Sequence, residues 1–62
     1  MAKVLSKLAD IRRKKNMSQE EVAEISGVSV RTIANAEGGK GVTFSTLKHI
    51  AKGLEVSAES LL

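Results

Sequence analysis

The sequence contains no cysteine, no proline, no tryptophan and no tyrosine, and Phe44 is its single aromatic residue. Without cysteine, neither a disulfide nor a thiolate metal site can stabilise the chain. Hydrophobic residues make up 42% of the 62 residues, so the core must consist almost wholly of aliphatic side chains and two methionines. We expect one domain, residues 1–62, with a free energy of unfolding of only a few kcal/mol, toward the low end of the usual ~5–15 kcal/mol.

Long apolar runs and catalytic clusters are also missing. No stretch approaches the ~18 apolar residues that a membrane span needs. The basic N-terminus continues into an amphipathic segment rather than the apolar core of a signal peptide, so we expect a cytoplasmic protein with no membrane contact. His49 is the only histidine, and it has no carboxylate pair or second ligand near it in the sequence. We therefore expect no enzymatic activity, no bound metal and no cofactor.

The net charge of +3 hides an uneven distribution. Basic residues outnumber acidic ones by five in residues 1–16, whereas acidic residues outnumber basic ones by three in residues 17–37. A basic flank of this kind suits contact with the phosphates of a nucleic acid. It equally suits the negative end of a helix dipole or solubility, so charge alone leaves both interpretations open.

Hydrophobic periodicity predicts helices over about 2–15 and 44–54, and a short last helix over 58–62. Their buried faces should be formed by Val4, Leu5, Leu8 and Ile11 in the first, by Phe44, Leu47, Ile50, Ala51 and Leu54 in the second, and by Val56 and Leu61 at the C-terminus. Thr43 and Ser57 are suited to cap the second and third of these helices. A glycine-rich loop, residues 38–43, precedes Phe44.

The central stretch, residues 18–37, predicts two short helices separated by a tight turn. Ser18 can cap the first, and two glutamates in its first turn suit the positive end of the helix dipole. Gly27 can adopt the left-handed backbone that ends a helix, and Ser29 can cap the second helix, residues 30–37. Two helices joined by about three residues that include glycine are typical of the helix-turn-helix, whose second helix enters the major groove of DNA.

Several residues at fixed offsets carry a family resemblance: Gln19, Val22, Ala23, Gly27, Val28, Ile33 and Glu37. The sequence resembles the Cro/C1-type phage-repressor (XRE) helix-turn-helix family, whose pattern runs roughly S-Q-x-x-L-A-x-x-x-G-V-S-x-x-x-I-x-x-x-E-x-G. The resemblance extends from about Lys3 to the C-terminus. It implies an all-α fold, a compact five-helix bundle like the lambda repressor DNA-binding domain, and binding to double-stranded DNA. The implied function is transcriptional regulation, most simply repression by occluding a promoter.

The resemblance implies that the second helix of the motif, residues 29–37, reads base edges. The implied base-reading residues are Val30, Arg31 and Asn35, with Ser29 and Thr32 beside them. Their chemistry agrees, because arginine can bond bidentately to guanine, asparagine to adenine, and an apolar group can pack on a thymine methyl. An exposed helix face must be polar in any case, but an apolar Val30 on that face is unexpected without a partner.

Phosphate contacts are implied for Gln19 and Lys40, and Arg13 and Lys14 remain available for phosphates or solvent. Gln19 is also expected to brace the start of the recognition helix. The loop that carries Lys40 departs from the family in lacking the usual proline. Three glycines without proline should make this loop more mobile.

The family resemblance also pairs Arg12, near the end of the first helix, with Glu37, which closes the recognition helix. We expect this ion pair to be structural rather than a phosphate contact. The last segment and the end of the preceding helix are implied to form a two-fold dimer contact, for which the candidates are Ala58, Ser60 and Leu62. The expected working form is a homodimer, weak in solution, on a palindromic operator.

Ser26 occupies a usually apolar position of the family pattern, and Ile25 a usually polar one. We favour a slight rotation of this helix that lets Ile25 replace the missing core contact. The alternative is an exposed Ile25 that marks a partner surface. An exposed Ile25 or Leu62 would favour an antitoxin that also masks a toxin. A helix-turn-helix retained purely as a protein-interaction module is the third possibility, and weak, salt-insensitive DNA binding would indicate it.

Overall fold

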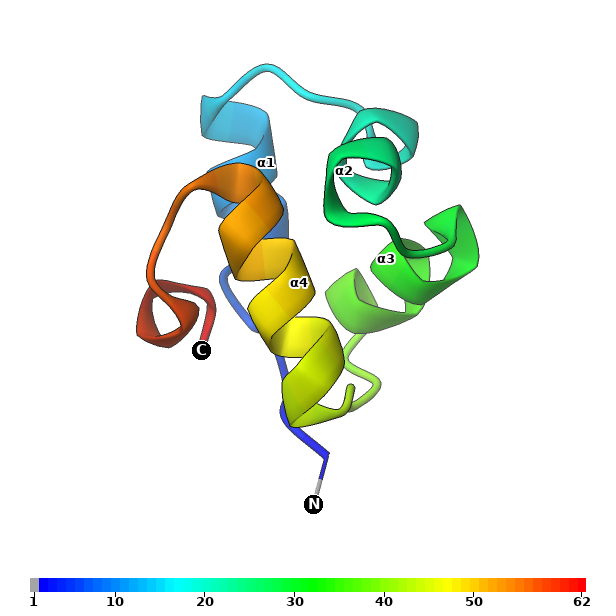
Figure 1. Ribbon diagram of the computed structural model, residues 1–62, viewed down its shortest axis with the longest axis vertical. Coiled ribbons are helices and arrows are strands. Elements are labelled where there is room, and N and C mark those ends of the chain that lie inside the picture. The colour runs from blue at the N-terminus through cyan, green and yellow to red at the C-terminus, as the bar shows by residue number, and fades with distance from the viewer. Residues whose placement is uncertain (1) are drawn as a thin grey trace.

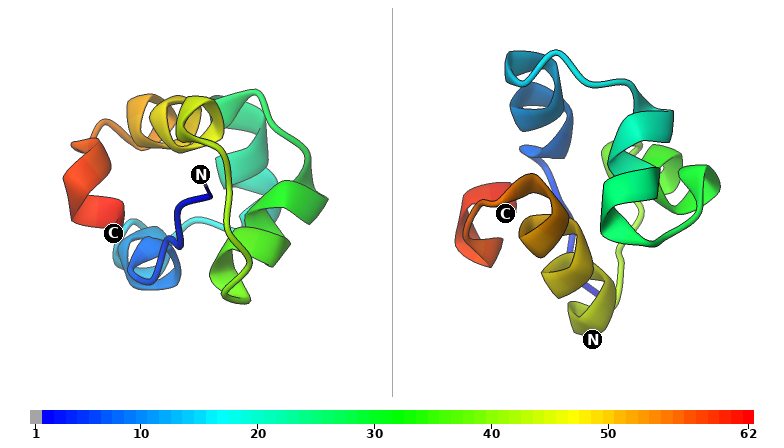
Figure 2. Two further views of the ribbon diagram at one scale, coloured as in Figure 1. Left: turned by 90° about the horizontal axis from the view of Figure 1, so that it is seen from below. Right: turned by 45° about the horizontal axis from the view of Figure 1, so that its top comes forward.

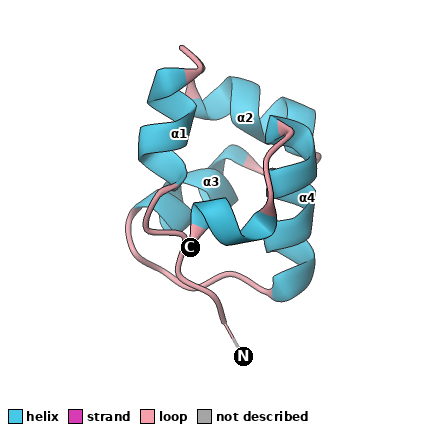
Figure 3. Cartoon of the chain, turned by 90° about the vertical axis from the view of Figure 1, so that its left-hand side faces the viewer, coloured by secondary structure: helices cyan, strands magenta, loops and turns pink. Residues whose placement is uncertain are grey.

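The structure, a computed structural model, describes residues 2–62, and the regular elements within these residues are helices and one isolated β-bridge. Its elements are α1 (Leu8–Lys14), α2 (Gln19–Ser26), α3 (Val30–Glu37), α4 (Phe44–Leu54) and a 3-10 turn, η1 (Ala58–Leu61). Figure 1 shows α4 at the centre, with α1 and the C-terminal turn on one side and α2 and α3 on the other. Figure 3 shows the chain in helices and loops alone. None of the helices within residues 2–62 is long and apolar enough to cross a membrane.

Serine and threonine side chains start four of these five elements. The N-caps are Ser18, Ser29, Thr43 and Ser57, and each side-chain oxygen accepts a hydrogen bond from the backbone N–H three residues on. At Ser18 the Glu21 side chain also accepts from the Ser18 N–H, which completes a capping box. Because each cap satisfies an N–H that would otherwise have no partner, the starts of these helices are fixed by local chemistry.

The helices end in a shared backbone motif with a residue in the left-handed conformation. At the end of α2, Gly27 has φ +70°, and the Val28 N–H donates to the Ala23 carbonyl 3.2 Å away. The left-handed residue is Asn16 after α1, Gly39 after α3 and Glu55 after α4. Each turn lets a free carbonyl of the last helical turn accept a hydrogen bond, so the chain can reverse direction without leaving it unpaired.

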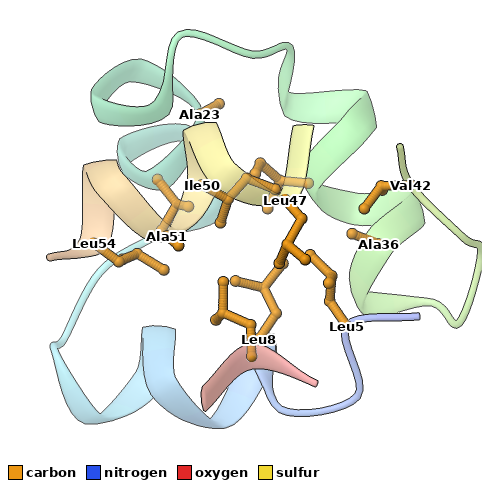
Figure 4. Packing of buried hydrophobic residues seen from close by; sticks show 12 residues of the cluster. Leu5, Leu8, Ala23, Ala36, Val42, Leu47, Ile50, Ala51 and Leu54 are labelled. Carbon is orange, nitrogen blue, oxygen red and sulfur yellow. The ribbon is translucent and has the colours of Figure 1, made fainter. Parts of the chain in front are cut away.

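The core fills the space between α4 and the other elements (Figure 4). Its largest fully buried side chains are Leu5, Leu8, Val22, Ile33, Leu47, Ile50 and Leu61. The stripe predicted for α4 is buried over Leu47, Ile50, Ala51 and Leu54. The same periodicity predicted that Phe44 lies in the core. That prediction is wrong, because Phe44 is 56% exposed. It begins α4 beyond the edge of the core, and the Lys48 ammonium lies 5.6 Å from its ring centroid.

The prediction of a first helix over 2–15 is wrong in its first half. Residues 2–7 instead form an N-terminal arm, and α1 begins at Leu8 without a side-chain cap. The Lys3 N–H donates to the Val42 carbonyl at 2.6 Å, and the Lys7 N–H donates to the Leu61 carbonyl at 3.2 Å. These long-range partners replace the hydrogen bonds of a helix. As a result Leu5 is buried as predicted, but Val4 is 50% exposed.

The expected five-helix bundle is therefore four α-helices and a 3-10 turn, because the last segment forms only the short η1. Leu61 is fully buried, and Val56 packs partly buried against the core. The segment is too short to propagate an α-helix, and Leu61 anchors it instead.

The predicted rotation of α2 is also wrong, because Ser26 is buried and Ile25 is 44% exposed. The reason lies on α4. A Cβ on Gly53 would stand 2.8 Å from the Ile25 carbonyl oxygen and 2.8 Å from Ser26 Oγ. The α2 and α4 backbones therefore approach so closely that only small residues fit between them. Ser26 Oγ has no hydrogen-bond partner within the described residues.

Arg12 and Glu37, the predicted ion pair, contact each other across the α1–α3 junction. Arg12 Nε donates to one Glu37 carboxylate oxygen, and its Nη2 donates to the other at 3.1 Å. Arg12 Nη1 also donates to the Met17 carbonyl at 2.9 Å. The Gln19 amide of α2 donates to the same carboxylate at 3.0 Å. The Glu37 side chain is only 9% exposed. Through these hydrogen bonds its carboxylate connects α3 to both preceding helices.

These contacts favour the charged form of Glu37. The hydrogen bond from Arg12 is the main reason that its pKa lies below the ordinary value of 4.5, and the Gln19 hydrogen bond adds to it, while burial acts in the opposite direction. The pKa of Arg12 is raised by the same hydrogen bond. Folding is therefore stabilised by an ionised Glu37 above its ordinary pKa, and this stabilisation is lost as the pH falls through the lower value of the folded state.

We predict that Gly53→Ala lowers the free energy of unfolding by about 1–3 kcal/mol, because the new methyl group overlaps the α2 backbone. An exposed helical glycine replaced by alanine ordinarily gains up to about 1 kcal/mol, so the sign is diagnostic. Ser26→Ala is the matched variant on the other helix. It removes a buried hydroxyl without a partner, so stability should stay equal or rise by up to about 1 kcal/mol. Urea unfolding monitored by circular dichroism measures both, and a stabilised Gly53→Ala protein would contradict this account.

We predict that Glu37→Gln costs about 1–3 kcal/mol at pH 7, since glutamine accepts hydrogen bonds without the charge that Arg12 needs. The difference from the unmodified chain should shrink as the pH falls from 4.5 through the lower pKa of the folded state, because Glu37 is protonated first in the unfolded chain and then in the folded one. Thermal unfolding at pH 7 and through the acid range measures it. Glu24→Gln, at an exposed site on α2, is the control. A difference that stays constant with pH would show that the carboxylate charge is irrelevant.

Candidate nucleic-acid interface

The pair α2 and α3 has the form of a helix-turn-helix. Only Gly27, Val28 and Ser29 separate the two helices, and the left-handed Gly27 turns the chain. Val22 and Ile33, one from each helix, are both fully buried in the core. Figure 1 shows α3 at the outer edge of the molecule. The turn therefore presents one side of α3 to solvent while the other side holds it in place.

The solvent side of α3 carries the predicted base-reading residues. Val30 is 41% exposed, and Arg31 is also exposed, so neither is used by the core. Asn35 and Thr32 are half-buried at the same helix's edge. The Ser29 and Thr32 hydroxyls lie 2.9 Å apart and are hydrogen-bonded to each other. Ser29 Oγ also accepts from the Thr32 N–H and so caps the helix, whereas the Arg31 and Asn35 side chains form no hydrogen bond with other residues in 2–62.

A shallow hollow lies between the α3 surface and the start of α4. It is lined by Thr32, Asn35, Lys40, Gly41, Val42, Thr43 and Thr46. Lys40 is exposed, and its backbone N–H donates to the Asn35 carbonyl at 3.0 Å. The structure thus brings Lys40, a predicted phosphate contact, next to Asn35, a predicted base contact. Thr46 also lines this hollow, and the sequence analysis did not predict it as a site residue. Its position three residues after the Thr43 cap, in the first turn of α4, could have indicated it.

The Gln19 contact differs from the expectation that it braces the start of the recognition helix. Its amide donates to Glu37, which is the last residue of α3, so it braces the opposite end. A side-chain amide has two N–H donors, and one remains free for a phosphate oxygen. Arg13 and Lys14 are exposed in the last turn of α1, and Arg13 Nη1 lies 4.0 Å from the exposed Asp10 carboxylate.

Of the predicted dimer residues, Ala58 and Ser60 lie on η1, and Leu62 directly follows it. Leu62 is 42% exposed, whereas Ala58 packs partly buried against the core. Ser60 Oγ donates to the Ser57 carbonyl at 2.6 Å. The described residues 2–62 contain no cluster of three or more metal-binding side chains. His49 is exposed, and its Nδ1 lies 2.7 Å from the Ser45 carbonyl.

Comparisons with known proteins agree with this geometry. Residues 8–61 match the model of the helix-turn-helix family HTH_3. Among solved structures, the restriction-modification controller protein C.AhdI from Aeromonas hydrophila is similar, with a TM-score of 0.84 and 26% identity over 92% of this chain and 88% of that one. A single-site mutant of the restriction-modification controller protein C.Esp1396I has a TM-score of 0.79 and 35% identity over 92% of this chain and 80% of that one. A search among curated proteins gave no match.

The family match begins at the first residue of α1 and ends at the last residue of η1, so it includes the helix-turn-helix and every other helical element of the described residues. The chain belongs to the Cro/C1-type (XRE) helix-turn-helix family of DNA-binding transcription regulators.

Proposed function

We propose that the protein is a sequence-specific regulator of transcription that inserts α3 into the major groove of double-stranded DNA. The observation that carries the proposal is the exposed face of α3. It presents an apolar Val30, the Arg31 guanidinium and the Asn35 amide on a helix whose end is held by the buried Glu37 carboxylate. A helix that reads bases must be both exposed and rigidly held, because recognition depends on hydrogen bonds of fixed geometry.

Each exposed group has a base that it suits. Arg31 would bond bidentately to guanine, Asn35 would bond to adenine, and Val30 or the Thr32 methyl would contact a thymine methyl. Gln19, Lys40, Arg13 and Lys14 would supply phosphate contacts that set affinity and orientation. The second N–H of the Gln19 amide leaves it able to serve a phosphate and Glu37 at once.

The proposed working form is a two-fold dimer on a palindromic operator, with half-sites about one turn (~34 Å) apart. The exposed Leu62 is the apolar candidate for its contact, with Ala58 and Ser60 beside it. These residues offer little apolar area, so we propose that the dimer is weak in solution and forms on DNA. Repression by occluding a promoter is the simplest outcome, and the cytoplasm, where the DNA would be met, is the proposed site of action.

The structural relatives favour gene control over toxin masking or protein interaction alone. Both are described as restriction-modification controller proteins, and one of them is 35% identical to this chain. We therefore propose control of a restriction-modification gene set as the specific role. No enzymatic role is proposed for the chain.

The test is selection from a randomised duplex pool at two salt concentrations, followed by sequencing of the bound fraction. We expect an enriched palindrome and an affinity that falls steeply as salt rises, because phosphate contacts release counterions. Enrichment of a single unrepeated half-site would contradict the dimer. No enrichment with little salt dependence would overturn the proposed function and direct attention to the exposed Ile25.

We predict that Arg31→Ala weakens binding to the selected operator by about 1–3 kcal/mol and relaxes specificity at one base position. Lys40→Ala should weaken all sequences alike and reduce the salt dependence by about one phosphate contact. Because each variant removes one positive charge, a difference between them cannot come from the change in net charge. Fluorescence anisotropy on operator and random duplexes measures both, and equal losses on the two duplexes for Arg31→Ala would remove Arg31 from the base-reading set.

A further inference from the structure

The N-terminal arm, residues 2–7, runs beside the loop between α3 and α4, residues 38–43. The Lys3 N–H donates to the Val42 carbonyl at 2.6 Å, and the Val42 N–H donates to the Lys3 carbonyl at 2.7 Å. This pair forms one isolated antiparallel bridge. Both views of Figure 2 show the start of the chain next to the segment that leads into α4. The arm is therefore bound to the loop by hydrogen bonds between the two backbones, so the contact depends little on the identity of the side chains.

Gly41 supports the same conclusion. A Cβ on Gly41 would overlap the Cβ of Ala2. Gly41 is not among the residues with positive φ, which are Asn16, Gly27, Gly39 and Glu55. Its backbone therefore does not require glycine. What requires glycine at position 41 is the presence of Ala2 against it.

The arm is itself fixed on its other side. Leu5 is 1% exposed, and so is part of the core. The Lys7 N–H donates to the Leu61 carbonyl, and Ser6 Oγ donates to the Leu62 carbonyl at 2.8 Å. An arm held by the core and by η1 can hold the loop still, whereas a free chain end could not.

The loop needs such support. It contains three glycines and no proline, so its backbone would otherwise sample many conformations. The Lys40 N–H bond to the Asn35 carbonyl holds the first half of the loop, and Thr43 ends the loop as the cap of α4. Between these two points the bridge holds Val42, which is 8% exposed.

We propose that the N-terminal arm is a positioning strap for this loop, which sets Lys40 at a fixed place beside Asn35 and the start of α4 before DNA arrives. The inference rests on the proposed function. A loop ordered in advance does not have to be ordered on binding, so affinity rises without a new contact. The strap acts through the phosphate side of the interface, and its effect is the same for every DNA sequence.

The first test is a pair of complementary substitutions. Gly41→Ala should displace the arm, weaken operator and random duplexes equally by about three- to tenfold, and speed hydrogen exchange of the Val42 amide in the absence of DNA. Adding Ala2→Gly to Gly41→Ala clears the space and should restore most of both properties. Ala2→Gly alone is the matched control and should change affinity less than Gly41→Ala. Circular dichroism melting establishes that each variant is folded.

The second test separates the backbone bond from the lysine charge. Lys3→Pro removes the N–H that donates to Val42, whereas Lys3→Ala keeps this N–H and removes the charge. We expect Lys3→Pro to weaken binding and Lys3→Ala to leave it nearly unchanged. Equal weakening by both, with a reduced salt dependence, would make Lys3 a direct phosphate contact and overturn the strap.

The outcomes also distinguish the strap from the proposed function. Faster Val42 exchange with unchanged DNA affinity in Gly41→Ala would overturn the strap and leave the function intact. Failure of the double variant to recover would likewise overturn it. If the unmodified chain bound no DNA, the function and this inference would fall together, while Val42 exchange would still report the bridge.

Discussion

The position of α3, the second helix of the helix-turn-helix, depends on one carboxylate. Glu37 closes α3 and receives hydrogen bonds from Arg12 of α1 and Gln19 of α2, in a site where its side chain is only 9% exposed. A shielded charge of this kind must be paired, because an unpaired one would cost several kcal/mol. The need to pair this charge fixes both the distance and the orientation of the end of α3 relative to α1, because a bidentate guanidinium contact tolerates little rotation. The exposed face of α3 inherits that orientation.

The parts of the fold that the sequence predicts well are those determined by neighbouring residues. The starts of α2, α3 and α4 follow from Ser18, Ser29 and Thr43, whose side chains reach N–H groups three residues away. Gly27 marks the turn of the helix-turn-helix for the same local reason. The partnership of Arg12 with Glu37 was available only through the family resemblance, because nothing local relates residues 25 positions apart.

The errors over residues 2–7, over Ile25 and Ser26, and over Phe44 concern how distant segments of the chain meet. Residues 2–7 have the periodicity of a helix, but bonds to Val42 and Leu61 compete successfully with helix formation. Ile25 and Ser26 were placed on the wrong faces, because the close approach of Gly53 is invisible in the α2 sequence. Phe44 fits the apolar repeat of α4 and still lies outside the core. Periodicity predicts which side of a helix faces the core, but not how far along the helix the core extends. The hollow that joins Asn35 to Lys40 is likewise a product of how α3 and α4 meet.

The contact between Lys7 and Leu61 also has a consequence for synthesis on the ribosome. Leu61 is fully buried and lies against the N-terminal arm, so a nascent chain that stops before it lacks part of its core. The helix-turn-helix is translated well before that residue, yet domains of this kind fold as units. Completion of the core therefore waits until Leu61 has left the exit tunnel.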